Sequence, residues 1–218
     1  MLLTARDVGV KKVVSASSVA VYGFLPDLPK REEMPVDPLS PYAVEKHAGE
    51  EYSRIFSSLY GLSTVCLRYF NVYGLRQDPH SDYAAAVPRF IQRIRSGEPP
   101  LIYGDGNRRG ILCMKDVVQA NIRAMSPLNA SGVYNIANGI GISVNDLAAM
   151  VLRVLGSEMQ PVYAEGRSGE VKHSVADVSK ARREFMFNPG YTLEKGLVEM
   201  LSSVISHQMT GGYRSSDF

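Results

Sequence analysis

"KKVVSASSVAVYG", residues 11–23, decides the fold of this 218-residue chain. Its first half is a short β-branched run without polar alternation, which is typical of a strand buried on both faces of a parallel sheet. "LSTVCLRYF", residues 62–70, has the same character. Between the two strands we predict a helix from Ser40, a suitable N-cap, to Tyr60, before Gly61. With a further helix predicted over residues 1–8, this order predicts an α/β fold with parallel strands.

The residue pattern of the chain changes after Gly74. Helical periodicity returns near residues 84–96, 115–126, 143–155 and 193–207, and short extended pieces such as "PLIYG" and "GVYNIAN" lie between the helices. We therefore expect one unit over residues 1–74 and a second, mainly over 75–207. The apolar stretch within 111–137 is suited to return to the first sheet, and residues 208–218 are expected to form a flexible tail.

The composition is that of an ordinary soluble globular protein, with 45% hydrophobic residues, 21% charged residues and a net charge of +2. Scattered positive charge gives no reason to expect a nucleic-acid or membrane-surface partner. Cys66 and Cys113 lie in apolar runs, which favours buried thiols in the reducing cytoplasm. The four histidines share no metal-ligand spacing, so no metal site is expected. We find neither a secretory signal nor an apolar stretch long enough to cross a bilayer.

Three polar residues suggest proton transfer. Tyr42 and Lys46 are four residues apart in the predicted helix and therefore share a face. A phenol is a poor base at neutral pH, but an ammonium about 5 Å away, at an effective dielectric of about 20, stabilises a phenolate by roughly 3 kcal/mol. Ser18 lies where a buried strand ends, the usual place for site residues in open parallel sheets. Together they form a candidate base, its cationic partner and a hydroxyl for the substrate.

The motifs "SSVAVYG", "SPYAVEK", "LRYFNVYG", "YGDG", "NIANG", "RSGEVKHSVADVSKAR" and "LEKGL" occur in this order. In this the chain resembles the extended short-chain dehydrogenase/reductases, in the NAD-dependent sugar-nucleotide epimerase branch. The resemblance implies a Rossmann-type parallel sheet with a smaller α/β substrate-binding domain, NAD as cofactor, a UDP-sugar substrate and a homodimer paired through the Tyr42 helix and the helix before it. It also implies that Ser18, Tyr42 and Lys46 are catalytic, and that the cofactor contacts Ser17, Tyr42, Lys46, Tyr69 and Phe70.

The same resemblance reduces the number of reactions to be considered. Relatives that eliminate water or carbon dioxide carry an acid just before Val-Tyr-Gly, where this chain has Val19 and Ala20. Epimerisation at C4 of the sugar is therefore favoured. The substrate contacts that the resemblance implies are Ser18, Asn71, Ala85, Ala86, Tyr103, Arg109, Arg167 and Ser174. A one-residue difference from the family after "GDG" leaves Arg108 as the alternative to Arg109.

Ser174 is the position most informative about the sugar. Relatives confined to plain hexoses resemble one another in having a tyrosine there, so a serine leaves room for a 2-acetamido group. This favours interconversion of UDP-GlcNAc and UDP-GalNAc, with UDP-Glc and UDP-Gal as further substrates.

One departure from the family is large. Relatives begin with a strand, a G-x-x-G-x-x-G turn and a helix that hold the dinucleotide, and we find no such motif here. Without that third we expect an open sheet edge, an uncovered apolar face and weak NAD binding. A catalytically silent fragment that retains a nucleotide-sugar pocket therefore remains an alternative. Another is a reductase or epimerase acting at a different carbon or on uronates, although we cannot locate the additional cation that a uronate requires.

Overall fold

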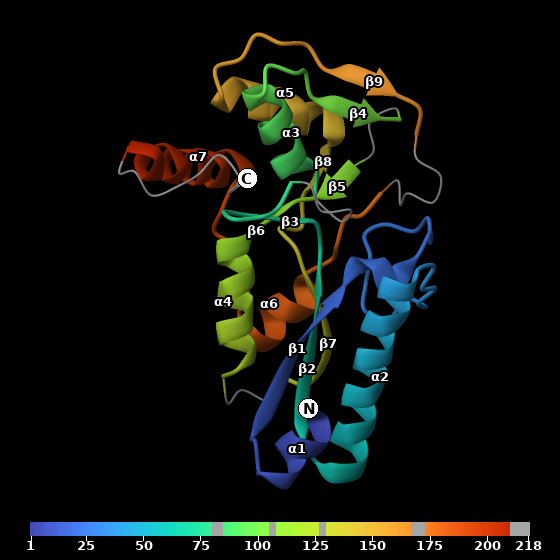
Figure 1. Ribbon diagram of the computed structural model, residues 1–218. Coiled ribbons are helices and arrows are strands. Elements are labelled where there is room, and N and C mark those ends of the chain that lie inside the picture. The colour runs from blue at the N-terminus through green and yellow to red at the C-terminus, as the bar shows by residue number, and fades with distance from the viewer. Residues whose placement is uncertain (80–84, 105–107, 127–129, 167–172, 210–218) are drawn as a thin grey trace.

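The computed structural model describes residues 1–79, 85–104, 108–126, 130–166 and 173–209, with side chains described to residue 202. A three-stranded parallel sheet in the order β1-β2-β7 forms one lobe, from β1 (Lys12–Ser18), β2 (Ser63–Tyr69) and β7 (Gly132–Ile136). Helix α2 (Pro41–Tyr60) covers one face, beside the short α1 (Leu2–Asp7) (Figure 1). Helices α4 (Met114–Ala124) and α6 (Ser179–Phe185) cover the other face. The truncated Rossmann-type α/β architecture expected from the sequence is confirmed.

Local chemistry fixes the ends of these elements. Ser18 ends β1 and its Oγ accepts a hydrogen bond from the Ala20 amide, which starts a 3₁₀ turn, η1 (Val19–Tyr22). Gly23 then has φ 58°, and a Cβ there would lie 2.1 Å from the Asp37 carbonyl oxygen, so the glycine of "VYG" is required. Helix α2 begins after Ser40, whose Oγ accepts from the Ala43 amide, and ends at Gly61 in the left-handed conformation.

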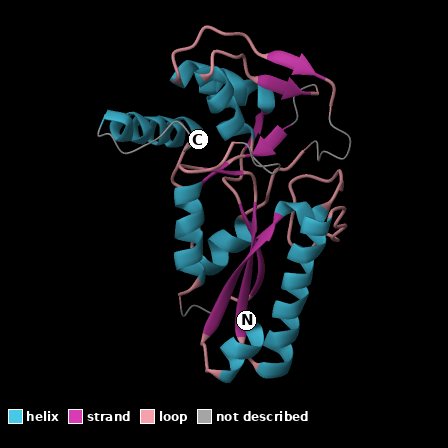
Figure 2. Ribbon diagram, in the orientation of Figure 1, coloured by secondary structure: helices cyan, strands magenta, loops and turns pink. Residues whose placement is uncertain are grey.

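The second lobe lies at the carboxyl ends of these strands (Figure 2). It contains α3 (Ala86–Arg95) packed on α5 (Val144–Val154), and two small sheets: β4 (Leu101–Tyr103) with β9 (Val162–Ala164), and β5 (Arg108–Gly110) with β8 (Gly141–Ser143). The parallel pair β3 (Val72–Tyr73) and β6 (Leu112–Cys113) lies between the lobes, and α7 (Leu193–Met209) projects from the second lobe. Each lobe has its own buried apolar cluster.

Two surfaces of the first lobe remain uncovered. Strand β1 is an edge of the sheet, paired on one side only. On α4, Met114, Val118, Ile122 and Met125 follow helical spacing and are 45–58% exposed. The open edge agrees with the expectation. The exposed apolar stripe differs from it, because it lies on the outer side of a helix, whereas both faces of the described strands are covered by helices. Within the described ranges, no helix is long and apolar enough to span a membrane.

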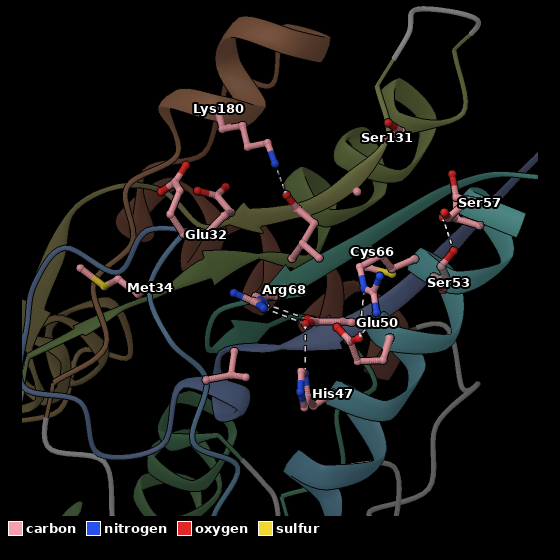
Figure 3. Close-up of a pocket in the computed structure, with 18 of the residues that line it drawn as sticks. Glu32, Met34, His47, Glu50, Ser53, Ser57, Cys66, Arg68, Ser131 and Lys180 are labelled. Carbon is pink, nitrogen blue, oxygen red and sulfur yellow. Dashed lines mark hydrogen bonds and ion pairs between the residues drawn. The ribbon is translucent and has the colours of Figure 1, made fainter. Parts of the chain in front are cut away.

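A buried ion pair joins three elements at one point. The Glu50 carboxylate of α2 accepts from the Ser17 hydroxyl of β1 (2.5 Å) and from Nε and Nη2 of Arg68 on β2 (2.8 and 2.7 Å). Ser17 and Arg68 are register partners in the sheet, so both reach the same carboxylate. Figure 3 shows the Arg68 and His47 side chains both directed at Glu50. Burial alone would lower the pKa of Arg68, but the hydrogen bonds and charge of Glu50 raise it above its ordinary value. We call this cluster the Glu50 joint.

The Glu50 joint makes a testable prediction about stability. Glu50→Leu leaves the Arg68 guanidinium buried without its counter-charge, so we expect the free energy of unfolding to fall by about 3–5 kcal/mol. The double variant Glu50→Leu/Arg68→Met removes both charges and should recover most of that loss. Urea unfolding followed by circular dichroism measures both. The control is Glu51→Leu, which breaks an exposed pair with Arg54 (45% and 66% exposed) and should cost less than about 1 kcal/mol. An equal effect of Glu50→Leu and Glu51→Leu would contradict the prediction.

Candidate functional site

A cavity of about 770 Å³ opens where β1 and β2 end and the second lobe begins. Its wall takes residues from both lobes, and it brings together most of the residues that the sequence analysis singled out: Ser17, Ser18, Tyr42, Tyr69, Asn71, Ala85, Ala86, Tyr103 and Arg109. The described part of the wall contains three arginines, Arg89, Arg93 and Arg109, and no carboxylate. Arg93 is paired with Glu98 outside the wall at 3.0 Å and donates to the Pro99 carbonyl. The remaining positive lining favours an anionic ligand.

Ser18 and Tyr42 face this cavity from different elements. Because the Ser18 oxygen already accepts from the Ala20 amide, its proton is available for a ligand oxygen. Tyr42 lies in the first turn of α2 and is 37% exposed. The Lys46 ammonium lies 5.4 Å from the centre of the Tyr42 ring, as the spacing of four residues predicts. The hydroxyl and the phenol are thus held at one cavity, with a cation one helical turn behind the phenol.

Two other tyrosines of the wall are unsuited to act as bases. The Tyr69 hydroxyl donates to Asn121 on α4 at 3.0 Å, and burial raises the pKa of that phenol. Tyr73 is 1% exposed, and burial together with nearby Cys113 raises its pKa as well. A raised pKa disfavours the phenolate that a base requires. Tyr42, close to Lys46 and partly exposed, is the better candidate.

The carbonyl oxygen is the part of the Asn71 amide left for a ligand. Its Nδ2 donates to the Gly110 carbonyl (3.1 Å) and to Ser174 Oγ (2.8 Å), and within the described residues its Oδ1 has no partner. Ser174 is 2% exposed and is held by backbone hydrogen bonds to Arg108 and Gly110. Ser174 therefore acts on the cavity through Asn71, whereas the sequence had suggested that it borders the sugar directly.

Arg109, and not Arg108, lies in the cavity wall. The Arg108 side chain is exposed and donates to the Gly141 carbonyl on β8. The strand β5 presents alternate side chains to opposite sides, which separates the two arginines. This position favours Arg109 over Arg108, and the role of Arg109 toward a ligand stays a prediction.

Besides Ser174, two described residues among the predicted site residues, Phe70 and Lys46, are not in the wall. The Phe70 ring is fully buried in a core cluster with Tyr22, and a contact with the cofactor stays a prediction. Lys46 lies behind Tyr42, where its ammonium is 3.4 Å from the exposed Glu45 carboxylate. Arg167 lies outside the described residues.

Residues that the sequence analysis missed complete the wall, above all Gln77 after β3 and Arg89 on α3. The amphipathic pattern of α3 was visible in the sequence, and it would have placed Arg89 one turn after Ala85 and Ala86 on the side away from the core. Gln77 follows a two-residue strand and carried no comparable signal.

A second cavity of about 660 Å³ lies beside α2 on the α2-covered face of the sheet (Figure 3). None of the predicted site residues lines it. Its cations are mostly committed, since Arg68 pairs with Glu50 and Arg54 with Glu51, while Glu32 and Glu33 add further carboxylates. This cavity is poorly suited to a phosphate-bearing ligand. Within the described ranges, no cluster of three or more His, Cys, Asp or Glu side chains is arranged to hold a metal ion.

Comparison with known proteins agrees with this geometry. Residues 1–137 match the model of the NAD dependent epimerase/dehydratase family. The chain belongs to this family. A "Putative UDP-glucose 4-epimerase" of Methanocaldococcus jannaschii is 36% identical over 207 residues, which cover 94% of this chain and 67% of the relative. A UDP-glucose 4-epimerase of Mycolicibacterium smegmatis is 36% identical over 197 residues, which cover 89% of this chain and 63% of the relative.

Solved structures of family members superpose well on the chain. The UDP-N-acetylglucosamine 4-epimerase of Methanobrevibacter ruminantium, in complex with UDP-N-acetylmuramic acid, is 40% identical with a TM-score of 0.89, and 94% of this chain covers 66% of it. The UDP-glucose 4-epimerase of Thermus thermophilus, in complex with NAD, is 34% identical with a TM-score of 0.81, and 92% of this chain covers 66% of it. The chain thus spans about two thirds of the length of these relatives.

The family uses NAD. The residues present suit the nicotinamide and ribose end of this cofactor. Ser17, Tyr42 and Tyr69 lie in the cavity wall, and Lys46 lies one helical turn from Tyr42. The Lys46 side chain is held only weakly, because its partner Glu45 is 73% exposed and ion pairs at the surface contribute little free energy. Its ammonium is therefore able to turn toward ribose hydroxyls.

Proposed function

We propose that the chain is, by lineage and by its site, a NAD-dependent UDP-sugar 4-epimerase. The observation that carries the proposal is the cavity that joins Ser18 and Tyr42 to a wall with three arginines and, in its described part, no carboxylate. UDP-GlcNAc and UDP-GalNAc are the favoured pair of substrates, with UDP-Glc and UDP-Gal beside them. Two relatives support this range: one is a UDP-N-acetylglucosamine 4-epimerase and is 40% identical, and the other is a UDP-glucose 4-epimerase.

In the proposed mechanism, Tyr42 as phenolate removes the proton of the 4′-hydroxyl while the Ser18 hydroxyl donates to the same oxygen. When bound, NAD supplies reversible hydride acceptance at C4′. The sugar passes through a 4-keto form, and Tyr42 returns its proton to the oxygen when the opposite face of C4′ is reduced. Lys46 stabilises the phenolate between the two proton transfers. No net oxidation results, so the substrate and product are isomers.

The nucleotide end is assigned to the second lobe. Arg109, which lines the cavity, is proposed to bind the diphosphate, because the guanidinium fork forms paired hydrogen bonds with phosphate oxygens and stays charged. Tyr103, on β4, is proposed to lie on the uracil ring, and the backbone at Ala85 and Ala86 to contact the nucleotide. We assign Arg167 to the diphosphate by family likeness alone.

A second candidate function is nucleotide-sugar binding without turnover. It is supported by the second-lobe part of the cavity wall, where Arg89, Arg109 and Tyr103 lie together. In this case these side chains would still hold a UDP-sugar, but no hydride transfer would follow.

Turnover distinguishes the two functions. We expect the protein, incubated with UDP-GlcNAc and NAD, to form UDP-GalNAc that chromatography detects. Tyr42→Phe removes the proton acceptor and should lower the rate by about 100-fold or more, while the affinity for UDP stays within about twofold. A wild-type protein that binds UDP without turnover would favour the binding function. Equal rates for wild type and Tyr42→Phe would refute the role of Tyr42.

The acetamido preference is proposed to depend on Ser174. A tyrosine there would have to displace the Asn71 amide that Ser174 holds at 2.8 Å, and its ring would take space from the sugar. Ser174→Tyr should therefore lower kcat/KM for UDP-GlcNAc relative to UDP-Glc by more than about tenfold. Ser174→Ala is the matched control, because it stays small and should keep the preference. An unchanged ratio in Ser174→Tyr would defeat this assignment.

We also propose a homodimer paired through α1 and α2. Val44, Tyr52, Ile55 and Leu59 lie on one stripe of α2 and are 38–69% exposed, and Leu3 of α1 is 56% exposed. Leu59→Glu should convert the dimer to a monomer in sedimentation velocity. Ile122→Glu, on the comparable stripe of α4, is the control and should leave the dimer intact. A monomeric wild type, or a dimer insensitive to Leu59→Glu, would overturn the proposal.

A further inference from the structure

Asn135 is a fully buried polar residue of β7 and the first residue of the motif "NIANG". Its Oδ1 accepts from the Tyr22 hydroxyl at 2.8 Å, and its Nδ2 donates to the Lys30 carbonyl at 2.9 Å and, more weakly, to the Asp177 carbonyl at 3.5 Å. Its backbone amide donates to the Glu32 carboxylate at 2.8 Å. Because the two carbonyl oxygens only accept, the side-chain amide has one orientation. One residue thus joins β7 to the turn after β1, to the loop that follows this turn and to the segment before α6.

The Tyr22 side of this network leads to the proposed catalytic hydroxyls. Tyr22 is the last residue of η1, the 3₁₀ turn that the Ser18 hydroxyl caps. The loop that follows η1 returns to it, because the Asp37 amide donates to a carbonyl of η1 at 2.9 Å. Helix α2, which carries Tyr42, begins shortly after this loop. The network therefore holds the connection between the strand that ends at Ser18 and the helix of Tyr42.

The Lys30 side of the network leads to the second lobe. The Lys30 carbonyl also accepts from the Asp177 amide at 2.9 Å, and the Lys30 amide donates to the Val175 carbonyl at 2.8 Å. Ser174, next along this segment, exchanges backbone hydrogen bonds with both neighbours of Arg109 on β5. This segment thus connects the loop of the first lobe to the strand that carries Arg109.

We propose that Asn135 is a positioning residue that aligns Ser18 and Tyr42 with Arg109, the proposed diphosphate contact. Asn135 is not in the cavity wall, so it acts through its neighbours. Proton removal from the 4′-hydroxyl depends on placement, and a displacement of about 1 Å costs roughly 100-fold in rate. Nucleotide binding depends on residues of the second lobe alone and is less sensitive to such a displacement. The inference rests on the proposed function and identifies a link between the lobes, whereas the Glu50 joint lies within the first lobe.

Kinetic constants separate positioning from a purely structural role. Asn135→Leu keeps the size of the side chain and removes its hydrogen bonds, so kcat for UDP-GlcNAc at saturating NAD should fall by about 30-fold or more. KM, and the dissociation constant of UDP from calorimetric titration, should stay within about threefold of wild type, which also shows that the variant is folded. Tyr22→Phe removes only the hydrogen bonds of the hydroxyl, keeps the ring in place, and should lower kcat by about tenfold.

The matched control is Thr64→Val. The Thr64 hydroxyl is buried and donates to the Ser53 carbonyl at 3.0 Å, at the end of β2 away from the cavity. Thr64→Val removes a buried hydrogen bond of the first lobe outside the Asn135 network, so kcat should stay within about twofold of wild type. The positioning role is overturned, and the epimerase function stands, if Thr64→Val lowers kcat as much as Asn135→Leu. The same holds if neither Asn135→Leu nor Tyr22→Phe lowers kcat by more than about twofold.

Hydrogen exchange tests the alignment without turnover. The Asp37 amide donates to the Val21 carbonyl and the Gly110 amide to the Ser174 carbonyl, on the two sides of the network. In Asn135→Leu both amides should exchange at least about tenfold faster, whereas the amides of α5, in the core of the second lobe, should keep the wild-type rate. Unchanged exchange at both amides would overturn the inference. If wild type forms no product, the proposed epimerase function fails, and the exchange rates alone decide whether Asn135 aligns the two lobes.

Discussion

The Glu50 joint is the constraint on which the site depends. One carboxylate holds the Ser17 hydroxyl of β1, the Arg68 guanidinium of β2 and its own helix α2 together, within hydrogen-bond distance and away from water. The next residue after Ser17 is Ser18, and Tyr42 lies two helical turns before Glu50 on α2. The distance between the two proposed catalytic hydroxyls is therefore set by an interaction in which neither takes part. A buried ion pair costs free energy to form. Its structural role here is to fix the distance between the Ser18 and Tyr42 hydroxyls.

The two cavities described above differ in charge. The cavity beside α2 is rich in carboxylates, and burial raises the pKa of one of them, Glu32. The cavity at the strand ends is lined by arginines and, in its described part, by no carboxylate. The diphosphate of the proposed substrate is suited to the cavity at the strand ends and not to the cavity beside α2. The fold alone would not have distinguished these cavities, since both border the same sheet.

Local patterns in the sequence predicted the elements of the first lobe and the long helices of the second. The apolar runs at residues 11–23 and 62–70, and the caps at Ser40 and Gly61, place β1, β2 and α2 where they are found. Among the strands of two or three residues, β4 lies within the predicted extended piece "PLIYG", whereas β3 and β5 escaped prediction because so few residues carry no periodicity. The seven-residue α6 was missed for a similar reason. Ser18, Tyr42 and Lys46 were identifiable from spacing and family likeness. The roles of Glu50 and Arg68 depend on a contact between different elements, which one sequence does not reveal.

The residues proposed for chemistry and those proposed for recognition come from different lobes. Ser18, Tyr42 and Lys46 come from β1 and α2, whereas Arg109, Arg89 and Tyr103 come from β5, α3 and β4. Asn71 lies at the boundary and is held by Gly110 and Ser174 of the second lobe, although it closely follows the strand that carries Arg68. Strand β1 is the free edge of the sheet. The lobe that carries Ser18 therefore supports this residue with a paired strand on one side only. Nucleotide binding by the second lobe does not require the free edge of β1 to be covered. Alignment of the sugar with Ser18 and Tyr42, in contrast, depends on how firmly β1 is held in place. Glu50 is the residue that links β1 to α2.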